Sequence, residues 1–201
     1  MAARRKAKAP SRWRWLWSPV KWATVALLGY LLACTLLLVA YRWVDPPITT
    51  VQIQRYAEAA VAGEPFALQY APVSEAEQDA DARHAVVASE DARFYTHHGF
   101  DAVELRAAYE EARAGGGMRG ASTLTQQLVK NLFLTTHRSW LRKGLELPLT
   151  VLAEWILPKD RILTLYLNSA EMGRGVFGLE AAARHHYGRS ASELTRDQAA
   201  R

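Results

Sequence analysis

The pattern of apolar and polar positions separates one long apolar segment from a series of amphipathic segments. Residues Trp22–Tyr41 contain no charged side chain and, at about 20 residues, are long enough to cross the hydrocarbon core of a bilayer. Tryptophans precede this segment and Trp43 follows it, as in the aromatic belts at membrane interfaces. A signal peptide has a shorter apolar core. The sequence therefore predicts an uncleaved transmembrane anchor over residues 22–43.

The pattern changes to that of amphipathic helices beyond this anchor. The sequence Asp45-Pro46-Pro47 ends the apolar helix. Residues 44–82 show only a weak pattern, for which we expect a short helix and an irregular, membrane-proximal connection. Helical periodicity recurs from about residue 83, whereas the alternation of strands is absent. The predicted helices are 83–96, 101–113, 123–134, 138–157, 159–168 and 176–187, with another starting at Thr195. The predicted fold class is an all-α domain over residues 83–201 behind a single N-terminal transmembrane helix.

The clearest helix start is at Thr123. With Gln126 three residues later, Thr123 forms a capping box, while Leu124, Leu128 and Leu132 share a face that would point to a core. Another side carries hydroxyl, amide and ammonium groups but no acid: Thr123, Gln126, Gln127 and Lys130. Such a face at a helix N-terminus suits an anionic, hydroxyl-rich ligand. An ordinary capped helix with a solvated face explains this stretch equally well.

The distribution of charge excludes one class of partner and gives the chain an orientation. The sequence has 25 Lys and Arg against 20 Asp and Glu, but residues 1–21 contain many basic and no acidic residues. By the positive-inside rule this tail is cytoplasmic and everything after Arg42 is outside. The rest of the chain is close to neutral, which argues against a nucleic-acid partner. Cys34 is the only cysteine, so the exported domain has no disulfide.

Glu90 is the first candidate for acid–base chemistry. It follows the apolar run Ala85–Ala88, so we expect it to be partly buried, a setting in which a carboxyl becomes a useful base near neutral pH. The ordinary alternative is a solvated acid at the end of a helix.

Glu146 is the second candidate, and it lies among cations. Arg142 and Lys143 precede it by four and three residues, and intrahelical ion pairs are the default explanation of this spacing. Together with Lys130 and Arg138, however, they form a cluster of cations of the kind that binds a pyrophosphate.

Four ordered motifs resemble those of the family 51 peptidoglycan glycosyltransferases. They are E-D-x-x-F-x-x-H-x-G-x-D at Glu90–Asp101, G-A-S-T-L-T-Q-Q-L-V-K-N at Gly120–Asn131, R-K-x-x-E at Arg142–Glu146 with K-x-R-I-L-x-x-Y-L-N at Lys159–Asn168, and G-x-G-x-x-G-x-E-A-A at Gly173–Ala182. The resemblance covers about Ala85 to Ala199 and is closest to the monofunctional form of the family.

The resemblance implies a lysozyme-like, all-helical fold with a smaller lobe against the membrane. It also implies an inverting glycosyltransferase that joins a growing lipid-linked chain to the 4-hydroxyl of undecaprenyl-diphosphate disaccharide-pentapeptide. The product is a β-1,4 glycan strand, and undecaprenyl diphosphate is released. Glu90 falls at the position of the general base and Glu146 at that of the donor-side carboxylate. The expected substrate-binding residues are Asp91, Phe94, His97, Ser122, Thr123, Gln127, Lys130, Asn131, Arg138, Arg142 and Lys143.

The family resemblance carries further expectations about ligands, location and length. It implies a divalent cation, Mg or Mn, at the diphosphate, for which the sequence shows no ligand set. It places the enzyme in the inner membrane with the catalytic domain in the periplasm, beside cell-division or cell-wall synthesis proteins. Thr195 opens a capped helix shortly before Arg201, whereas members of the family continue further, so we expect a C-terminal truncation. The glycine-rich stretch Ala114–Met118 predicts a mobile loop that orders when substrate binds.

Other classes of protein share only parts of this pattern. A lysozyme-like enzyme that cleaves glycan has no use for a cation cluster beside a membrane span. A bifunctional penicillin-binding protein needs a K-T-G motif, and a zinc hydrolase needs H-E-x-x-H; the sequence contains neither. A non-catalytic membrane scaffold would tolerate the loss of Glu90 or of the cations, all of which are present.

Overall fold

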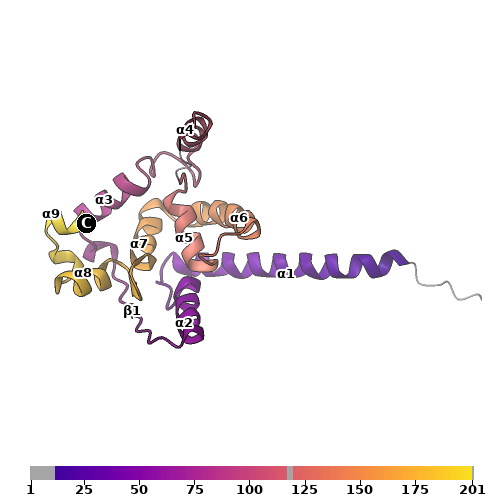
Figure 1. Cartoon of the computed structure of the whole chain (residues 1–201), viewed down its shortest axis with the longest axis horizontal. Coiled ribbons are helices and arrows are strands. Elements are labelled where there is room, and N and C mark those ends of the chain that lie inside the picture. Colours follow the sequence, from indigo (N-terminus) through magenta and orange to yellow (C-terminus); the bar gives the residue numbers. More distant parts are fainter. Residues whose placement is uncertain (1–11, 117–119, 201) are drawn as a thin grey trace, which may run out of the picture.

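The computed structural model describes residues 12–116 and 120–200, and within them one long helix projects from a body of shorter helices (Figure 1). The long helix, α1, spans Arg12–Tyr41. Its part Pro19–Tyr41 is long and apolar enough to cross a membrane. One apolar N-terminal helix of this kind fits a single-pass membrane anchor.

The body is built almost entirely from helices, which confirms the predicted fold class. Their bounds are α2 Thr50–Ala62, η1 Glu75–Glu77, α3 Ala80–Glu90, α4 Ala102–Arg113, α5 Leu124–Phe133, α6 Trp140–Ile156, α7 Lys159–Ser169, α8 Leu179–Tyr187, η2 Ala191–Glu193 and α9 Arg196–Ala199. The predicted capping boxes at Thr123 and Thr195 are both formed, so α5 and α9 begin where their local sequences indicate. The weak pattern of residues 44–82 corresponds to α2 followed by an irregular connection.

The helix predicted over residues 83–96 is shorter than expected, because α3 ends at Glu90. Asp91 leaves the helical conformation with φ −159° and ψ 70°. Its carboxylate accepts a hydrogen bond from the backbone N–H of Leu124 at 3.0 Å. This contact draws Asp91 into the interior, and turns and bends follow to Gly99.

A small three-stranded sheet was not predicted. Strand β1 (Gln69–Tyr70) pairs in parallel with β3 (Val176–Phe177), which pairs in antiparallel with β2 (Glu171–Gly173). Strands of two or three residues are too short to show an alternating pattern in the sequence. Because β3 occupies the start of the helix predicted over residues 176–187, α8 begins only at Leu179.

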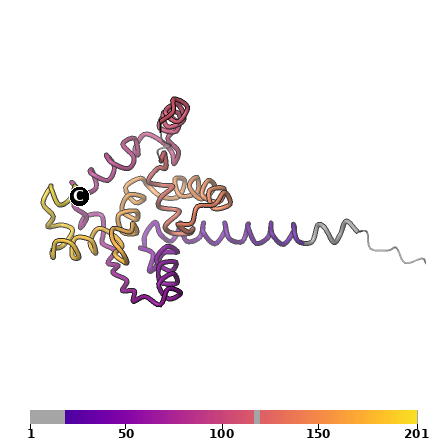
Figure 2. The backbone as a smooth tube through the Cα atoms, viewed as in Figure 1, coloured from indigo at the N-terminus to yellow at the C-terminus, as the bar shows by residue number. Residues whose placement is uncertain are grey.

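The main core joins α5, α6 and α7 to the C-terminal part of α1, which lies against the body (Figure 2). Cys34 and Leu38 of α1 are buried in it. The Tyr30 hydroxyl donates to the carbonyl of Phe133 at 2.8 Å, and Arg161 Nε donates to the carbonyl of Tyr41 at 2.7 Å. The apolar helix is therefore packed against the body along its last three turns.

Helix α6 packs on α1 and turns an apolar face outward. Four of the five large apolar side chains that are exposed on this helix have spacings that place them on one side. They are Trp140, Leu147, Val151 and Trp155. Exposed apolar side chains gathered on one face are typical of an interaction site, and this face lies on a helix that packs against the long apolar helix α1.

Candidate active site

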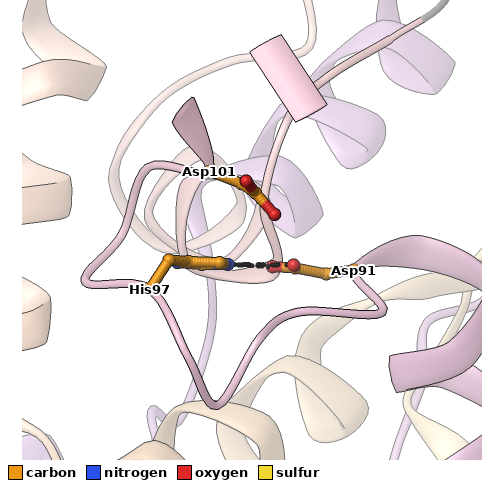
Figure 3. Close-up of side chains that lie close together, drawn as sticks. All are labelled: Asp91, His97 and Asp101. Atoms are coloured by element: carbon orange, nitrogen blue, oxygen red, sulfur yellow. Dashed lines mark hydrogen bonds and ion pairs between the residues drawn. The ribbon is translucent and has the colours of Figure 1, made fainter. Parts of the chain in front are cut away.

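The loop that follows α3 is tied to the start of α5 by Asp91. The Asp91 carboxylate lies 2.9 and 3.0 Å from Nε2 of His97 (Figure 3) and also accepts the N–H of Leu124. Because Nδ1 of His97 accepts the N–H of Gly99 at 3.2 Å, the ring proton lies on Nε2 and points at Asp91. These contacts fix the backbone of Glu90, the preceding residue, relative to α5.

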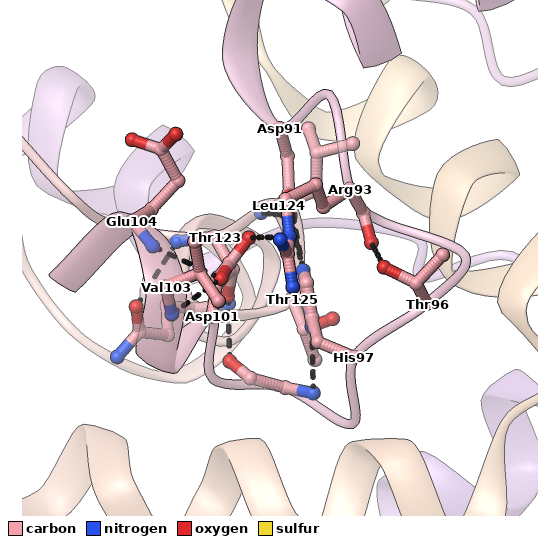
Figure 4. Close-up of polar contacts among 12 residues, drawn as sticks. Asp91, Arg93, Thr96, His97, Asp101, Val103, Glu104, Thr123, Leu124 and Thr125 are labelled. Carbon is pink, nitrogen blue, oxygen red and sulfur yellow. Dashed lines mark hydrogen bonds and ion pairs between the residues drawn. The ribbon is translucent and has the colours of Figure 1, made fainter. Parts of the chain in front are cut away.

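Asp101 closes the same loop and caps α4. Its Oδ1 accepts the N–H groups of Val103 and Glu104 at 2.9 and 3.1 Å, and its Oδ2 lies 3.0 Å from Arg93 Nε (Figure 4). Burial raises the pKa of Asp101, but the N–H donors of Glu104 and Val103 and the charge of Arg93 outweigh it, so the pKa is lowered overall.

Asp91, His97 and Asp101 are also a grouping that could hold a metal ion. Their ligand atoms lie within 4.8 Å of one another, and all three side chains are buried. In the structure Asp91 bonds to His97 and to the N–H of Leu124 at the start of α5. Asp101 instead bonds to two N–H groups of α4 and pairs with Arg93, so both carboxylates hold the loop in place.

Glu90 presents an exposed carboxylate at the end of α3. The expectation that it is partly buried is wrong, because α3 lies at the edge of the body (Figure 1) and only Ala82 on this helix is buried. Its Oε2 accepts a hydrogen bond from Gln127 Nε2 at 2.9 Å, and Oε1 of Gln127 accepts one from the Tyr166 hydroxyl at 3.3 Å. Glu90 is thus held in place by α5 while it remains open to ligands.

Two cavities have Glu90 in their walls, and a third adjoins one of them. The first, of about 200 Å³, is lined by Glu90 and Asp91 and by Gly120–Thr123. The second, of about 710 Å³, lies between α3, α8 and α9 and has Glu90 and Tyr166 in its wall. The third, of about 750 Å³, shares Gly120 and Ser122 with the first. The first and third cavities therefore adjoin, and we call them together the cleft.

The third cavity concentrates positive charge around one buried carboxylate. It is lined by Lys130, Arg138, Arg142 and Lys143. Glu146 is 2% exposed, and its two oxygens lie 2.7 Å from Arg142 Nη1 and 2.5 Å from Lys143 Nζ. One carboxylate cannot balance four cations, so this cavity attracts anions.

Lys130, on α5, is close enough to both Glu90 and Glu146 to interact with their charges. Burial lowers the pKa of Lys130, and the neighbouring charge of Arg142 lowers it further, whereas Glu146 and Glu90 oppose this change. A bound anion would stabilise the charged form of Lys130. The anion therefore binds more tightly when Lys130 is protonated than when it is neutral.

The third cavity does not fit the divalent cation expected at the diphosphate. Both oxygens of Glu146 are engaged by Arg142 and Lys143, and the other charged groups that line this cavity are cations. Among the described residues, the protein thus offers this site positive charge and no free carboxylate.

The predicted binding residues divide into those that line the cleft and those that support it. The residues in the cleft wall are Asp91, Ser122, Thr123, Gln127, Lys130, Arg138, Arg142 and Lys143. Phe94 is fully buried beneath Lys159, whose Nζ lies 4.4 Å from the ring centroid. His97 and Asn131 are buried as well. Contact of these three with substrate stays a prediction.

Sequence reasoning missed Tyr166, which reaches Gln127 from α7. It lies in the apolar run of Ile162–Leu167, so its pattern indicates only a core residue. The predicted mobile loop at Ala114–Met118 is described as far as Gly116, and the rest of it lies outside the described residues.

Known proteins provide an independent comparison. A family model described as Transglycosylase matches residues 60–201. A biosynthetic peptidoglycan transglycosylase of Pseudomonas putida (strain W619) is 48% identical over 180 residues, which cover 87% of this chain and 74% of the relative. Another, of Chromohalobacter salexigens, is 46% identical over 187 residues and covers 93% of this chain and 80% of the relative. A third, of Pseudomonas aeruginosa, is 47% identical over 173 residues, with 86% and 75% covered.

Proposed function

Since the chain belongs to the transglycosylase family and is a peptidoglycan glycosyltransferase, we propose that it polymerises glycan strands from a lipid-linked precursor. It transfers the growing chain from undecaprenyl diphosphate to the 4-hydroxyl of an undecaprenyl-diphosphate-linked disaccharide-pentapeptide. The new bond is β-1,4 and the anomeric configuration is inverted. The observation that carries this proposal is an exposed, oriented carboxylate beside a cavity of four cations.

Glu90 is the general base of the proposed reaction. The hydrogen bond from Gln127 engages Oε2 and leaves Oε1 to accept the proton of the sugar hydroxyl. A positioned carboxylate within hydrogen-bond reach of the attacking group is what such catalysis requires. The tie between Asp91 and α5 keeps Glu90 at one place in the cleft.

The third cavity holds the diphosphate of the donor. Charge that develops on the leaving group is stabilised by Lys130, Arg142 and Lys143, so departure needs no protonated acid. Glu146 orients Arg142 and Lys143 through its two ion pairs. A base on one side of the anomeric carbon and cations on the other suit a single displacement with inversion.

The membrane brings the substrate to the cleft. In the proposed topology α1 crosses the inner membrane, the basic N-terminus is cytoplasmic and the body is periplasmic. The contact between Tyr30 and Phe133 lies roughly 16 Å along α1 from Tyr41, at about 1.5 Å per residue. The body is therefore seated in the outer leaflet, and the exposed apolar face of α6 contacts lipid. Because Trp140 belongs to both this face and the third cavity, a lipid-linked diphosphate enters from the bilayer.

Synthesis of polymer is the expected activity. Purified protein in liposomes should convert the lipid-linked disaccharide-pentapeptide into long glycan strands and release undecaprenyl diphosphate, with β anomeric carbons detectable by nuclear magnetic resonance. Preformed glycan should stay intact. Cleavage of preformed glycan without any synthesis would favour a lysozyme-like enzyme, and absence of both activities would favour a scaffold. Cell-division and cell-wall synthesis proteins remain proposed partners.

The seating in the membrane can be measured with a fluorescent probe. We expect an environment-sensitive fluorophore on Val151→Cys, in a chain carrying Cys34→Ala, to show apolar, blue-shifted emission in liposomes. Val151 is 52% exposed on the outward face of α6. Ser192→Cys is the matched control, because η2 lies at the end of the body opposite the projecting part of α1 (Figure 1), and its probe should report water. Water-like emission at both positions would contradict this seating.

A further inference from the structure

A chain of two hydrogen bonds connects the exposed carboxylate of Glu90 to the interior of the protein. Tyr166 of α7 donates its O–H to Oε1 of Gln127 on α5, and Nε2 of Gln127 donates to Oε2 of Glu90. The sequence separations are 39 and 37 residues. Three helices are thus coupled at one polar point beside the cleft.

Both inner members of this chain are held by well-packed helices. Tyr166 is 7% exposed, and its neighbours Leu165 and Leu167 are fully buried. Gln127 follows the start of α5 between Leu124 and Leu128, which are fully buried too. Side chains on such a scaffold keep one arrangement, whereas the carboxylate of Glu90 has solvent on its other side.

The amide of Gln127 has an NH₂ group that donates hydrogen bonds and an oxygen that accepts them. The orientation of the amide decides which of the two faces Glu90. With the NH₂ group toward Glu90, the amide stabilises a carboxylate; with the oxygen toward Glu90, it would repel a carboxylate and favour a carboxylic acid. A hydroxyl that donates to Oε1 secures the first direction. Burial raises the pKa of Tyr166 to about 12, and the charge of Glu90 adds to this, so the phenol keeps its proton throughout the working range of pH.

We propose that Tyr166 is a positioning residue for the glycosyl transfer, which fixes the amide of Gln127 so that its NH₂ group holds the carboxylate of Glu90 in one orientation. The inference rests on the proposed role of Glu90 as the base. Tyr166 itself need not touch the substrate, and it acts through Gln127.

Other charged and titratable groups also face Glu90 and act on its carboxylate. Lys130 of α5 is close enough for the two charges to interact. The walls of the two cavities that contain Glu90 add acids and two groups from α8: Asp91, Asp101, Glu104, Glu171, His186 and Tyr187. The test therefore changes a single uncharged hydroxyl and leaves all of these groups in place.

The variant Tyr166→Phe removes one oxygen from the hydrogen-bond chain. We expect kcat for polymerisation to fall roughly three- to tenfold, as for one net hydrogen bond, with the affinity for undecaprenyl diphosphate unchanged. The loss should appear in kcat and not in KM, because the carboxylate of Glu90 loses the donor that holds it in one orientation. Tyr56→Phe, at a tyrosine exposed on α2, is the matched control and should behave as the unaltered protein does.

A double-mutant cycle with Gln127→Ala separates positioning from packing. If Tyr166 acts through Gln127, the double variant should be no slower than Gln127→Ala alone. Additive losses, or a kcat for Tyr166→Phe that equals that of the unaltered protein, would overturn the proposal. Glu90→Gln, assayed alongside, distinguishes a failure of this inference from a failure of the assignment of Glu90 as the base. If Glu90→Gln is inactive while Tyr166→Phe is normal, only this inference fails. If Glu90→Gln polymerises normally, the assignment of the base fails.

Discussion

The Glu90→Gln variant is expected to lose polymerisation by about 10²–10⁴-fold, the usual effect of removing a general base and roughly 3–5 kcal/mol in activation free energy. Glutamine has nearly the same size and still offers an oxygen to Gln127, so the local structure is preserved. Undecaprenyl diphosphate should bind as well as before, since Glu90 is not among the residues that line the third cavity. The loss should therefore appear in kcat.

A matched control shows that the effect belongs to this position. Glu77→Gln changes an exposed glutamate of η1 whose capping contact with Ser74 a glutamine can also make. This variant should polymerise at the normal rate. A Glu90→Gln enzyme that retains more than about a tenth of the normal kcat, well above the range for loss of a base, would refute the assignment. In that case another group in the cleft must accept the proton.

The sequence predicted those features that depend on residues close together in the chain. The capping box at Thr123 needs only Gln126, and the clustering of Arg142 and Lys143 around Glu146 needs only one helical turn. Each signal lies within four residues, so tertiary contacts did not have to be known. The apolar helix is a local feature in the same sense, because the length and composition of one continuous segment are enough to predict it.

Features decided by distant contacts could not be predicted. The end of α3 is set by Asp91, whose partner Leu124 is 33 residues away, and the exposure of Glu90 follows from the position of α3 at the edge of the body. The sheet joins residues near 70 and 176 through two-residue strands. Tyr166 lies in an apolar pattern, and nothing local shows that its hydroxyl bonds to Gln127. The motifs predicted which residues belong to the site, whereas the burial and orientation of their side chains depend on tertiary contacts.

The Lys130→Ala variant is expected to weaken both the binding of undecaprenyl diphosphate and the rate of polymerisation. A hydrogen bond to a charged group contributes roughly 1.5–3 kcal/mol, which corresponds to about a 10- to 100-fold loss of affinity. The contact exists before and during bond breaking, so kcat/KM should fall at least as far. Arg138→Ala should have a smaller effect, because Arg138 is exposed and its charge is screened by water.

The pH dependence of binding distinguishes Lys130 from the arginines of the same cavity. Burial and the charge of Arg142 lower the pKa of Lys130, so in the free enzyme this group loses its proton at a lower pH than an ordinary lysine does. A bound diphosphate favours the protonated form, so affinity should decline as pH rises through that lowered pKa. Lys130→Arg keeps its charge at every working pH and should abolish the decline, while Lys130→Ala should bind weakly at all pH values. Titration of each variant with undecaprenyl diphosphate across the alkaline range measures this, and an alkaline decline that persists in Lys130→Arg would assign it to a different group.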